Sequence, residues 1–172
     1  MSEIVFENVS RTPRAGVKGP GASTWLAALY LPVTRTPNSW LPLPGGLIAR
    51  LGLAEFLVEG PEAAKLAAPL APDVYPVLRQ DTALVLKGAR LNDLLLETCS
   101  VDFSALDLAA RPVVLTSMAG VGVTAVPGDD NGVPCIRLWC DGTYGEWFIE
   151  TLAGVACELT QPGHPAHQGV TA

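Results

Sequence analysis

The stretch AGVKGPGASTWLAALYL, residues 15–31, places three glycines directly ahead of an apolar run. A phosphate-binding loop would require the pattern G-x-x-x-x-G-K-[S/T] or G-x-G-x-x-G. The glycines here are spaced G-x-x-G-x-G, Lys18 precedes the last two of them, and Pro20 removes a backbone N–H donor. We therefore interpret the stretch as the corner between a strand and a helix.

The same pattern occurs a second time along the chain. Val17–Gly19 is followed by apolar residues with the spacing of one buried helix face, at Ala22, Trp25, Leu26 and Leu29. The segment Leu86–Gly88 is followed by a similar apolar face, at Leu91, Leu94 and Leu95. The glycines that end the two segments lie 69 residues apart. This recurrence predicts an internal repeat.

The segments that follow these two predicted helices also resemble each other. Leu47–Gly60 predicts a strand, a turn and a strand, followed by a helix that begins at Pro61. In the second half, strands are expected in Pro112–Gly128 and Val133–Gly142. The last helix is then expected to begin with the capping box of Thr143 and Glu146. Its predicted core face comprises Trp147, Phe148, Leu152, Val155 and Leu159.

Each half therefore reads strand, helix, strand, strand, helix, and a joining strand is predicted at Tyr75–Leu86. This pattern indicates an α+β fold built from two split βαβ, ferredoxin-like halves. We expect a single cooperative domain over residues 1–160, with pseudo-repeats at about 14–72 and 73–160. Residues 161–172 are expected to form a flexible tail, and the proline-rich segment Arg35–Gly46 an excursion between elements.

Composition excludes several classes of partner. The 172 residues are 49% hydrophobic and carry a net charge of −6, which disfavours binding to nucleic acid. No apolar stretch is long enough to span a membrane, and the N-terminus MSEIVFENVSR has acidic residues where a signal peptide has basic ones. A cytoplasmic protein without membrane contact is expected.

No motif predicts a catalytic, cofactor-binding or metal-binding residue in this chain. The only two histidines, His164 and His167, lie among prolines and glycines that prevent a helix from aligning them. The thiols show no C-x-x-C pair, and we expect buried, unreactive cysteines at Cys99, Cys135, Cys140 and Cys157. Asp129 and Asp130 precede Asn-Gly, which is typical of a hairpin turn.

Two groups of residues are candidates for contact with a partner. In the proline-rich segment, the apolar side chains of Trp40, Leu41 and Leu43 could anchor an interface, and Trp40 could equally cover the sheet of its own chain. Arg79 and Asp81 are predicted on one face of the joining strand, where they form either a local ion pair or a contact to a partner.

Together, several stretches within residues 14–159 resemble the gamma subunit of heterotetrameric sarcosine oxidase, and more broadly the folate-binding domain of aminomethyltransferases of the glycine cleavage system. The resemblance rests mainly on GVKGPGASTWLAA, GGLIARLGLAEFLVEG, VYPVLRQDTALVLKGARLNDLLLETCSVDF and IRLWCDGTYGEWFIETL.

The resemblance implies a scaffold subunit that carries no cofactor, in complex with alpha, beta and delta chains and chiefly with the large alpha chain. FAD, FMN, NAD, tetrahydrofolate and zinc would belong to those partners. Such a complex oxidises sarcosine or a related N-methyl amino acid to glycine, passes the one-carbon unit to tetrahydrofolate and forms hydrogen peroxide. The alternative is a stand-alone folate-binding or folate-dependent methyl- or aminomethyl-transfer protein of the same fold.

Overall fold

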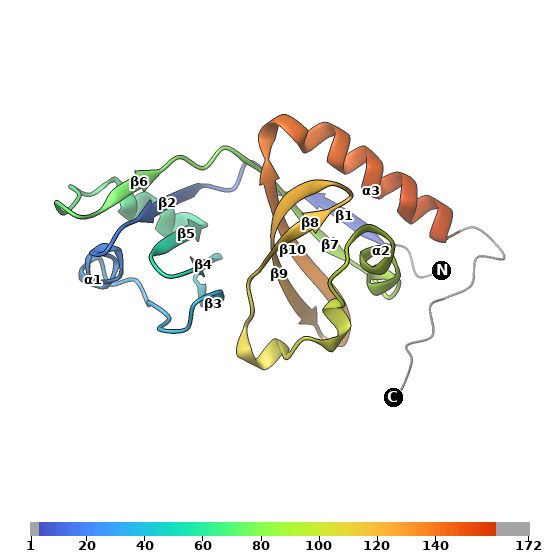
Figure 1. Cartoon of the computed structure of the whole chain (residues 1–172), viewed down its shortest axis with the longest axis horizontal. Coiled ribbons are helices and arrows are strands. Elements are labelled where there is room, and N and C mark those ends of the chain that lie inside the picture. Colours follow the sequence, from blue (N-terminus) through green and yellow to red (C-terminus); the bar gives the residue numbers. More distant parts are fainter. Residues whose placement is uncertain (1–3, 161–172) are drawn as a thin grey trace. The chain divides into compact units, whose positions relative to one another are not determined.

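The computed structural model describes residues 4–160 of the chain. Within this range the fold divides into two compact units, each with one antiparallel sheet (Figure 1). Unit 1 contains residues 4–10, 81–108 and 115–160, and unit 2 contains residues 11–80 and 109–114. These boundaries differ from those of the predicted repeats, because segments from both ends of the sequence contribute to unit 1.

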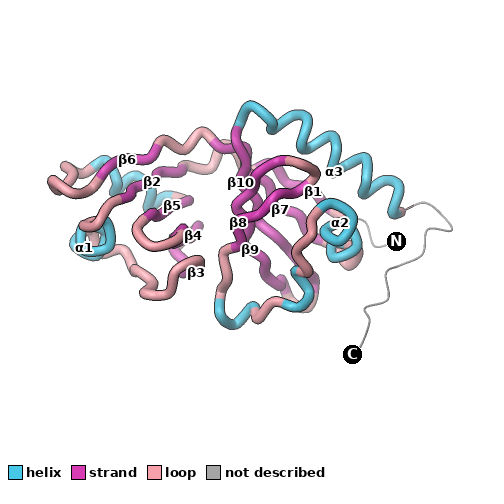
Figure 2. Tube along the Cα trace, viewed as in Figure 1, coloured by secondary structure: helices cyan, strands magenta, loops and turns pink. Residues whose placement is uncertain are grey.

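The sheet of unit 2 has the strand order β3-β4-β5-β2-β6. Short helical segments connect and flank these strands (Figure 2). In chain order the elements are β2 (Arg14–Lys18), α1 (Ala22–Ala28), β3 (Ser39–Leu43), β4 (Gly46–Leu51), β5 (Glu55–Glu59), the 3-10 helix η1 (Pro61–Ala67) and β6 (Tyr75–Val77).

The sheet of unit 1 has the order β1-β7-β10-β9-β8, and its two longer helices, α2 and α3, pack against each other. Its strands are β1 (Val5–Asn8), β7 (Asp81–Lys87), β8 (Val114–Met118), β9 (Val121–Asp130) and β10 (Val133–Asp141). Its helical elements are α2 (Leu91–Thr98), α3 (Gly145–Leu159) and the short 3-10 turns η2 (Phe103–Ala105), η3 (Leu108–Ala110) and η4 (Gly142–Tyr144).

The two sheets repeat the same order. The strand order of unit 1 can be written as β8-β9-β10-β7-β1 and that of unit 2 as β3-β4-β5-β2-β6. Strands at the same position in these two orders are equivalent. The last strand of each order is exchanged between the two halves of the sequence. Strand β1 precedes β2 in the chain but pairs with β7, and β6 precedes β7 in the chain but pairs with β2. The predicted duplication is therefore present, with three strands after each helix instead of two. The fold is α+β, with antiparallel sheets.

The glycines of the opening stretch form a tight corner, as predicted. Gly19 donates its N–H to the carbonyl of Ala54 at 3.0 Å, and Gly21 donates to that of Asp73 at 3.4 Å. A Cβ on Gly19 would lie 2.2 Å from the Asp73 carbonyl oxygen. In the second repeat, Gly88 likewise donates to Pro134 at 3.1 Å. These N–H groups bind the chain's own carbonyls, which explains the glycines without a phosphate.

The faces of α1 and α2 follow the predicted spacing, whereas α3 buries Ala156 in place of the predicted Val155. In unit 2, Trp25 and Leu26 of α1 pack with Val17, Ile48 and Phe56 of the sheet. In unit 1, α2 buries Leu91, Leu94 and Leu95, and α3 buries a face that consists of Gly145, Phe148, Leu152, Ala156 and Leu159. Burial of large aliphatic and aromatic side chains contributes about 1.5–3 kcal/mol each, so these faces hold the helices on their sheets.

Two strand predictions were wrong. Ser39–Leu43, inside the expected excursion, is strand β3 and pairs with β4. Its position at the sheet edge tolerates Pro42, because an edge strand has N–H groups that need no partner in the sheet. The expected joining strand Tyr75–Leu86 is split into β6 and β7, which belong to different sheets. Arg79 consequently lies between strands and Asp81 begins β7.

The helix predictions also need correction. The segment after Pro61 forms a 3-10 helix. Thr143 does not cap α3, because its backbone N–H and its hydroxyl both bond to Asp141 Oδ1, at 2.8 and 2.7 Å. The helix starts at Gly145, and Trp147 is 52% exposed instead of buried. Its neighbour Phe148 occupies the core position, and one residue on a helix corresponds to a rotation of about 100°.

Among the described residues, no helix is long and apolar enough to cross a membrane. The predicted flexible tail, with His164 and His167, lies outside the described residues.

Candidate functional site

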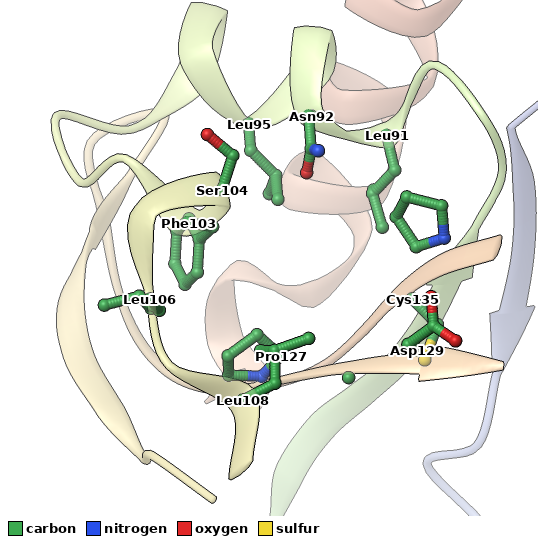
Figure 3. A pocket seen from close by; sticks show the side chains of 12 residues that line it. Leu91, Asn92, Leu95, Phe103, Ser104, Leu106, Leu108, Pro127, Asp129 and Cys135 are labelled. Carbon is green, nitrogen blue, oxygen red and sulfur yellow. The ribbon is translucent and has the colours of Figure 1, made fainter. Parts of the chain in front are cut away.

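A cavity of about 160 Å³ lies in unit 1, between α2, the turn η2 and the ends of β9 and β10 (Figure 3). Helix α2 contributes Leu91, Asn92 and Leu95 to its wall, and η2 contributes Phe103 and Ser104. The rest of the lining is Leu106, Leu108, Pro127, Gly128, Asp129, Pro134 and Cys135. No sequence motif predicted this cavity.

Most polar groups of the cavity wall already have partners. Ser104 Oγ donates to Asp102 Oδ1 at 2.5 Å, within the cap of η2. Asp129 Oδ1 accepts the N–H of Gly132 at 2.6 Å, within the β9–β10 hairpin turn. Asn92 is half-buried and adds an amide to the apolar lining. The cavity can therefore hold a small apolar group and offer it one amide contact.

The thiol of Cys135 lines the same cavity. Partial burial raises the pKa of this thiol, and the carboxylates of Asp130 and Asp129 raise it further. A higher pKa leaves less thiolate at neutral pH, and the thiolate is the nucleophilic form. The environment of Cys135 thus suppresses the reactivity of the thiol at the cavity.

A second, shallower hollow of about 460 Å³ lies over strands β7, β8, β9 and β10 of unit 1. Asp81 and Asp141 stand directly opposite each other on β7 and β10 at its edge, and Leu115 and Trp139 supply apolar surface. Like charges opposed across a strand pair repel each other, which favours hydrogen-bond donors or cations over anions at this edge. The pKa of Asp141 is lowered by the hydrogen bonds from Thr143.

The predicted interface residues fall in several environments. Trp40 is half-buried in β3, and the guanidinium carbon of Arg111 lies 5.8 Å from the centre of its ring. Leu41 and Leu43 are partly buried against the core of unit 2. Arg79 Nη2 donates to Glu55 Oε1 of β5 at 2.8 Å. The contact of these residues with a partner stays a prediction.

The cysteine prediction holds for two of the four thiols. Cys99 and Cys140 are buried, Cys135 is half-buried and Cys157 is exposed on α3. Cys157 follows the core residue Ala156, so its side chain is turned away from the sheet. Within residues 4–160, no group of three or more His, Cys, Asp or Glu side chains could hold a metal ion.

We expect iodoacetamide at pH 8 to modify Cys157 of the native protein much faster than Cys140. Burial raises the pKa of Cys140 to about 11, from an ordinary value of 9.0. This shift lowers the thiolate fraction at pH 8 about 100-fold, and burial slows the reagent further. Peptide mass spectrometry over time measures both rates, and in denaturant the two rates should converge. Equal rates in the native protein would contradict the burial of Cys140.

Comparison with solved structures identifies two proteins of similar fold. One is a chain of the heterotetrameric sarcosine oxidase from Corynebacterium sp. U-96, solved in complex with pyrrole 2-carboxylate. The match has a TM-score of 0.75 and 18% sequence identity, and covers 92% of this chain and 86% of that chain. At this identity the similarity establishes the fold.

The second is aminomethyltransferase T of the glycine cleavage system from Bartonella henselae, with a TM-score of 0.63 and 14% identity. The match covers 88% of this chain and 46% of the transferase, so this chain corresponds to less than half of that enzyme. No protein-family model and no curated protein sequence matches the chain. The chain thus has an aminomethyltransferase-like fold.

Proposed function

We propose that this chain is a non-catalytic structural subunit, of the gamma type, in a heterotetrameric flavin-dependent oxidase. The complex would oxidise sarcosine or a related N-methyl amino acid to glycine, pass the one-carbon unit to tetrahydrofolate and form hydrogen peroxide. Its partners would be alpha, beta and delta chains in the cytoplasm, chiefly the large alpha chain. FAD, FMN, NAD, tetrahydrofolate and zinc would be held by those chains.

The observation that carries this proposal is the mutual coverage of the first match. This chain and one chain of a heterotetrameric sarcosine oxidase align over 92% and 86% of their lengths. The proposal requires a chain that has this fold and aligns with most of one subunit of such an oxidase. The match to aminomethyltransferase T reaches 46% of that enzyme, and so offers weaker support for the alternative.

The two hollows of unit 1 described above are consistent with a scaffold. Sites for drug-sized ligands and cofactors occupy about 300–1,000 Å³, and the cavity beside α2 measures about 160 Å³. It is therefore too small for a flavin. The shallow hollow is larger, at about 460 Å³, but the carboxylate of Asp141 at its edge would repel the phosphate of a flavin nucleotide and the glutamate carboxylates of a folate.

The experiment separates the proposal from a stand-alone folate-binding protein. The purified chain should show no flavin absorbance and no binding of tetrahydrofolate by calorimetry, and it should have no oxidase activity. Co-expressed with the alpha, beta and delta chains of a heterotetrameric sarcosine oxidase, it should co-purify with them. A yellow preparation of the chain alone would contradict the proposal, and micromolar binding of tetrahydrofolate would favour the alternative.

A further inference from the structure

Helix α3 has a second face that its own unit does not bury. Tyr144 and Trp147 are 55% and 52% exposed, although both are large aromatic side chains. Steps of three and four residues place a stripe along one side of the helix, which consists of Tyr144, Trp147, Thr151 and Gly154. We call this stripe the α3 outer face. Exposed aromatic side chains that gather on one face are typical of a docking surface.

Gly154 supports this interpretation independently. Glycine is the most unfavourable residue in a helix interior after proline, and Gly154 lies within α3. Apart from the backbone of its own helix turns, a Cβ built on it would meet no atom of residues 4–160 within 4 Å, so the described fold does not require a glycine there. Close approach of another chain to the helix backbone would require one.

Charge restricts the partner. Every ionisable carboxylate or amine on α3 is a glutamate, namely Glu146, Glu150 and Glu158, and the helix has no lysine or arginine. The nearby Arg90 donates to the carbonyl of Leu159 at the end of the helix and pairs with Asp93 at 2.7 Å. An acidic apolar face repels a second copy of itself, anionic lipid and nucleic acid.

We propose that the α3 outer face docks onto a different protein chain that presents an apolar pocket for Trp147 surrounded by lysine or arginine. Trp147 enters this pocket, Gly154 allows the partner to approach the helix, and Glu150 pairs with its basic rim. The identity of the partner rests on the proposed function, which makes it another subunit of the same complex.

The test uses the full tagged chain co-expressed with the alpha, beta and delta chains of a heterotetrameric sarcosine oxidase. Trp147→Ala should weaken binding about 30-fold or more, the effect of removing an aromatic hot spot. Glu150→Lys should weaken binding and reduce its dependence on salt. Tyr30→Ala is the matched control, because Tyr30 is an aromatic residue of unit 2 that is 91% exposed, and it should leave binding unchanged.

The substitution Gly154→Leu distinguishes a role in docking from a role in folding, because it should stabilise the isolated chain and weaken the complex. The substitution should raise the melting temperature of the isolated chain by about 2–4 °C, since leucine favours the helix and has space. It should weaken complex formation at least 10-fold, because the side chain fills the approach path of the partner.

Each outcome has a separate meaning. If the wild-type chain does not co-purify with the flavoproteins, the proposed function and this inference both fail. If it co-purifies and both Trp147→Ala and Gly154→Leu bind like wild type, the proposed function stands and the α3 outer face is not the docking surface. A homodimer in sedimentation experiments that Trp147→Ala dissociates would make a second copy the occupant and overturn the inference.

Discussion

Replacing Glu59 by alanine should destabilise the protein by about 3–5 kcal/mol. Glu59 Oε2 accepts a hydrogen bond from Arg14 Nη1 at 3.2 Å, and the side chains of Arg14 and Glu59 are 4% and 0% exposed. The two residues are directly opposite on β2 and β5. The truncation would remove this carboxylate from the buried guanidinium of Arg14. Burying the charge of Arg14 without this carboxylate costs free energy, and this cost accounts for most of the loss of stability.

Thermal unfolding measures this loss as a fall in melting temperature of about 6–20 °C. Glu62→Ala is the control, because Glu62 pairs with Lys65 on the surface of η1 and should cost less than about 1 kcal/mol. The double substitution Arg14→Met with Glu59→Leu should recover much of the stability, since it replaces both charges by apolar side chains of similar size. A Glu59→Ala variant as stable as wild type would show that the pair is hydrated.

Local chemistry explains which parts of the fold the sequence could predict. The glycine corners, the apolar faces of α1 and α2 and the Asn131-Gly132 turn are each determined by residues close together in the chain. Asn131 and Gly132 both have positive φ, at 56° and 86°, as a two-residue hairpin of the predicted kind requires. These features therefore appeared in the structure at the expected positions.

The errors arise where a distant segment decides the outcome. Pro42 argued against a strand, but β3 lies at a sheet edge, a position that only the complete sheet defines. The sequence pattern placed Trp147 on the core face of α3, yet this side chain is 52% exposed. Trp147 and Phe148 are adjacent and both apolar, so the pattern assigned both to the core face, whereas the complete fold buries only Phe148.

The cavity beside α2 could not be predicted for the same reason. Its wall combines Leu91, Phe103 and Pro127, which lie on three separate elements. None of them belongs to a motif with a fixed spacing. The separation of Arg79 from Asp81 is likewise a consequence of sheet membership, since β6 and β7 pair with strands of different units. Sequence periodicity describes a strand but does not determine its neighbours.

Separating the chain at the repeat boundary should abolish cooperative folding. A fragment of residues 1–72 would keep β1 without β7, its partner, and would lack β6. A fragment of residues 73–172 would lack β1 in the same way. Each fragment therefore exposes the edge of a strand that is paired in the whole chain, β2 in the first and β7 in the second. Each also carries a strand whose partner is missing, and unpaired strands promote aggregation. Near-ultraviolet circular dichroism and thermal melts should show no native packing and no sharp transition.

A control fragment tests whether strand exchange is the cause. Residues 11–80 contain all five strands of the unit 2 sheet, so this fragment should retain more strand structure than residues 1–72 at nearly the same length. Refolding residues 1–72 together with residues 73–172 should also restore a melting transition, because each piece supplies the edge strand that the other lacks. Sharp, independent transitions in fragments 1–72 and 73–172 would mean that β1 and β6 contribute little and that each repeat buries enough surface alone.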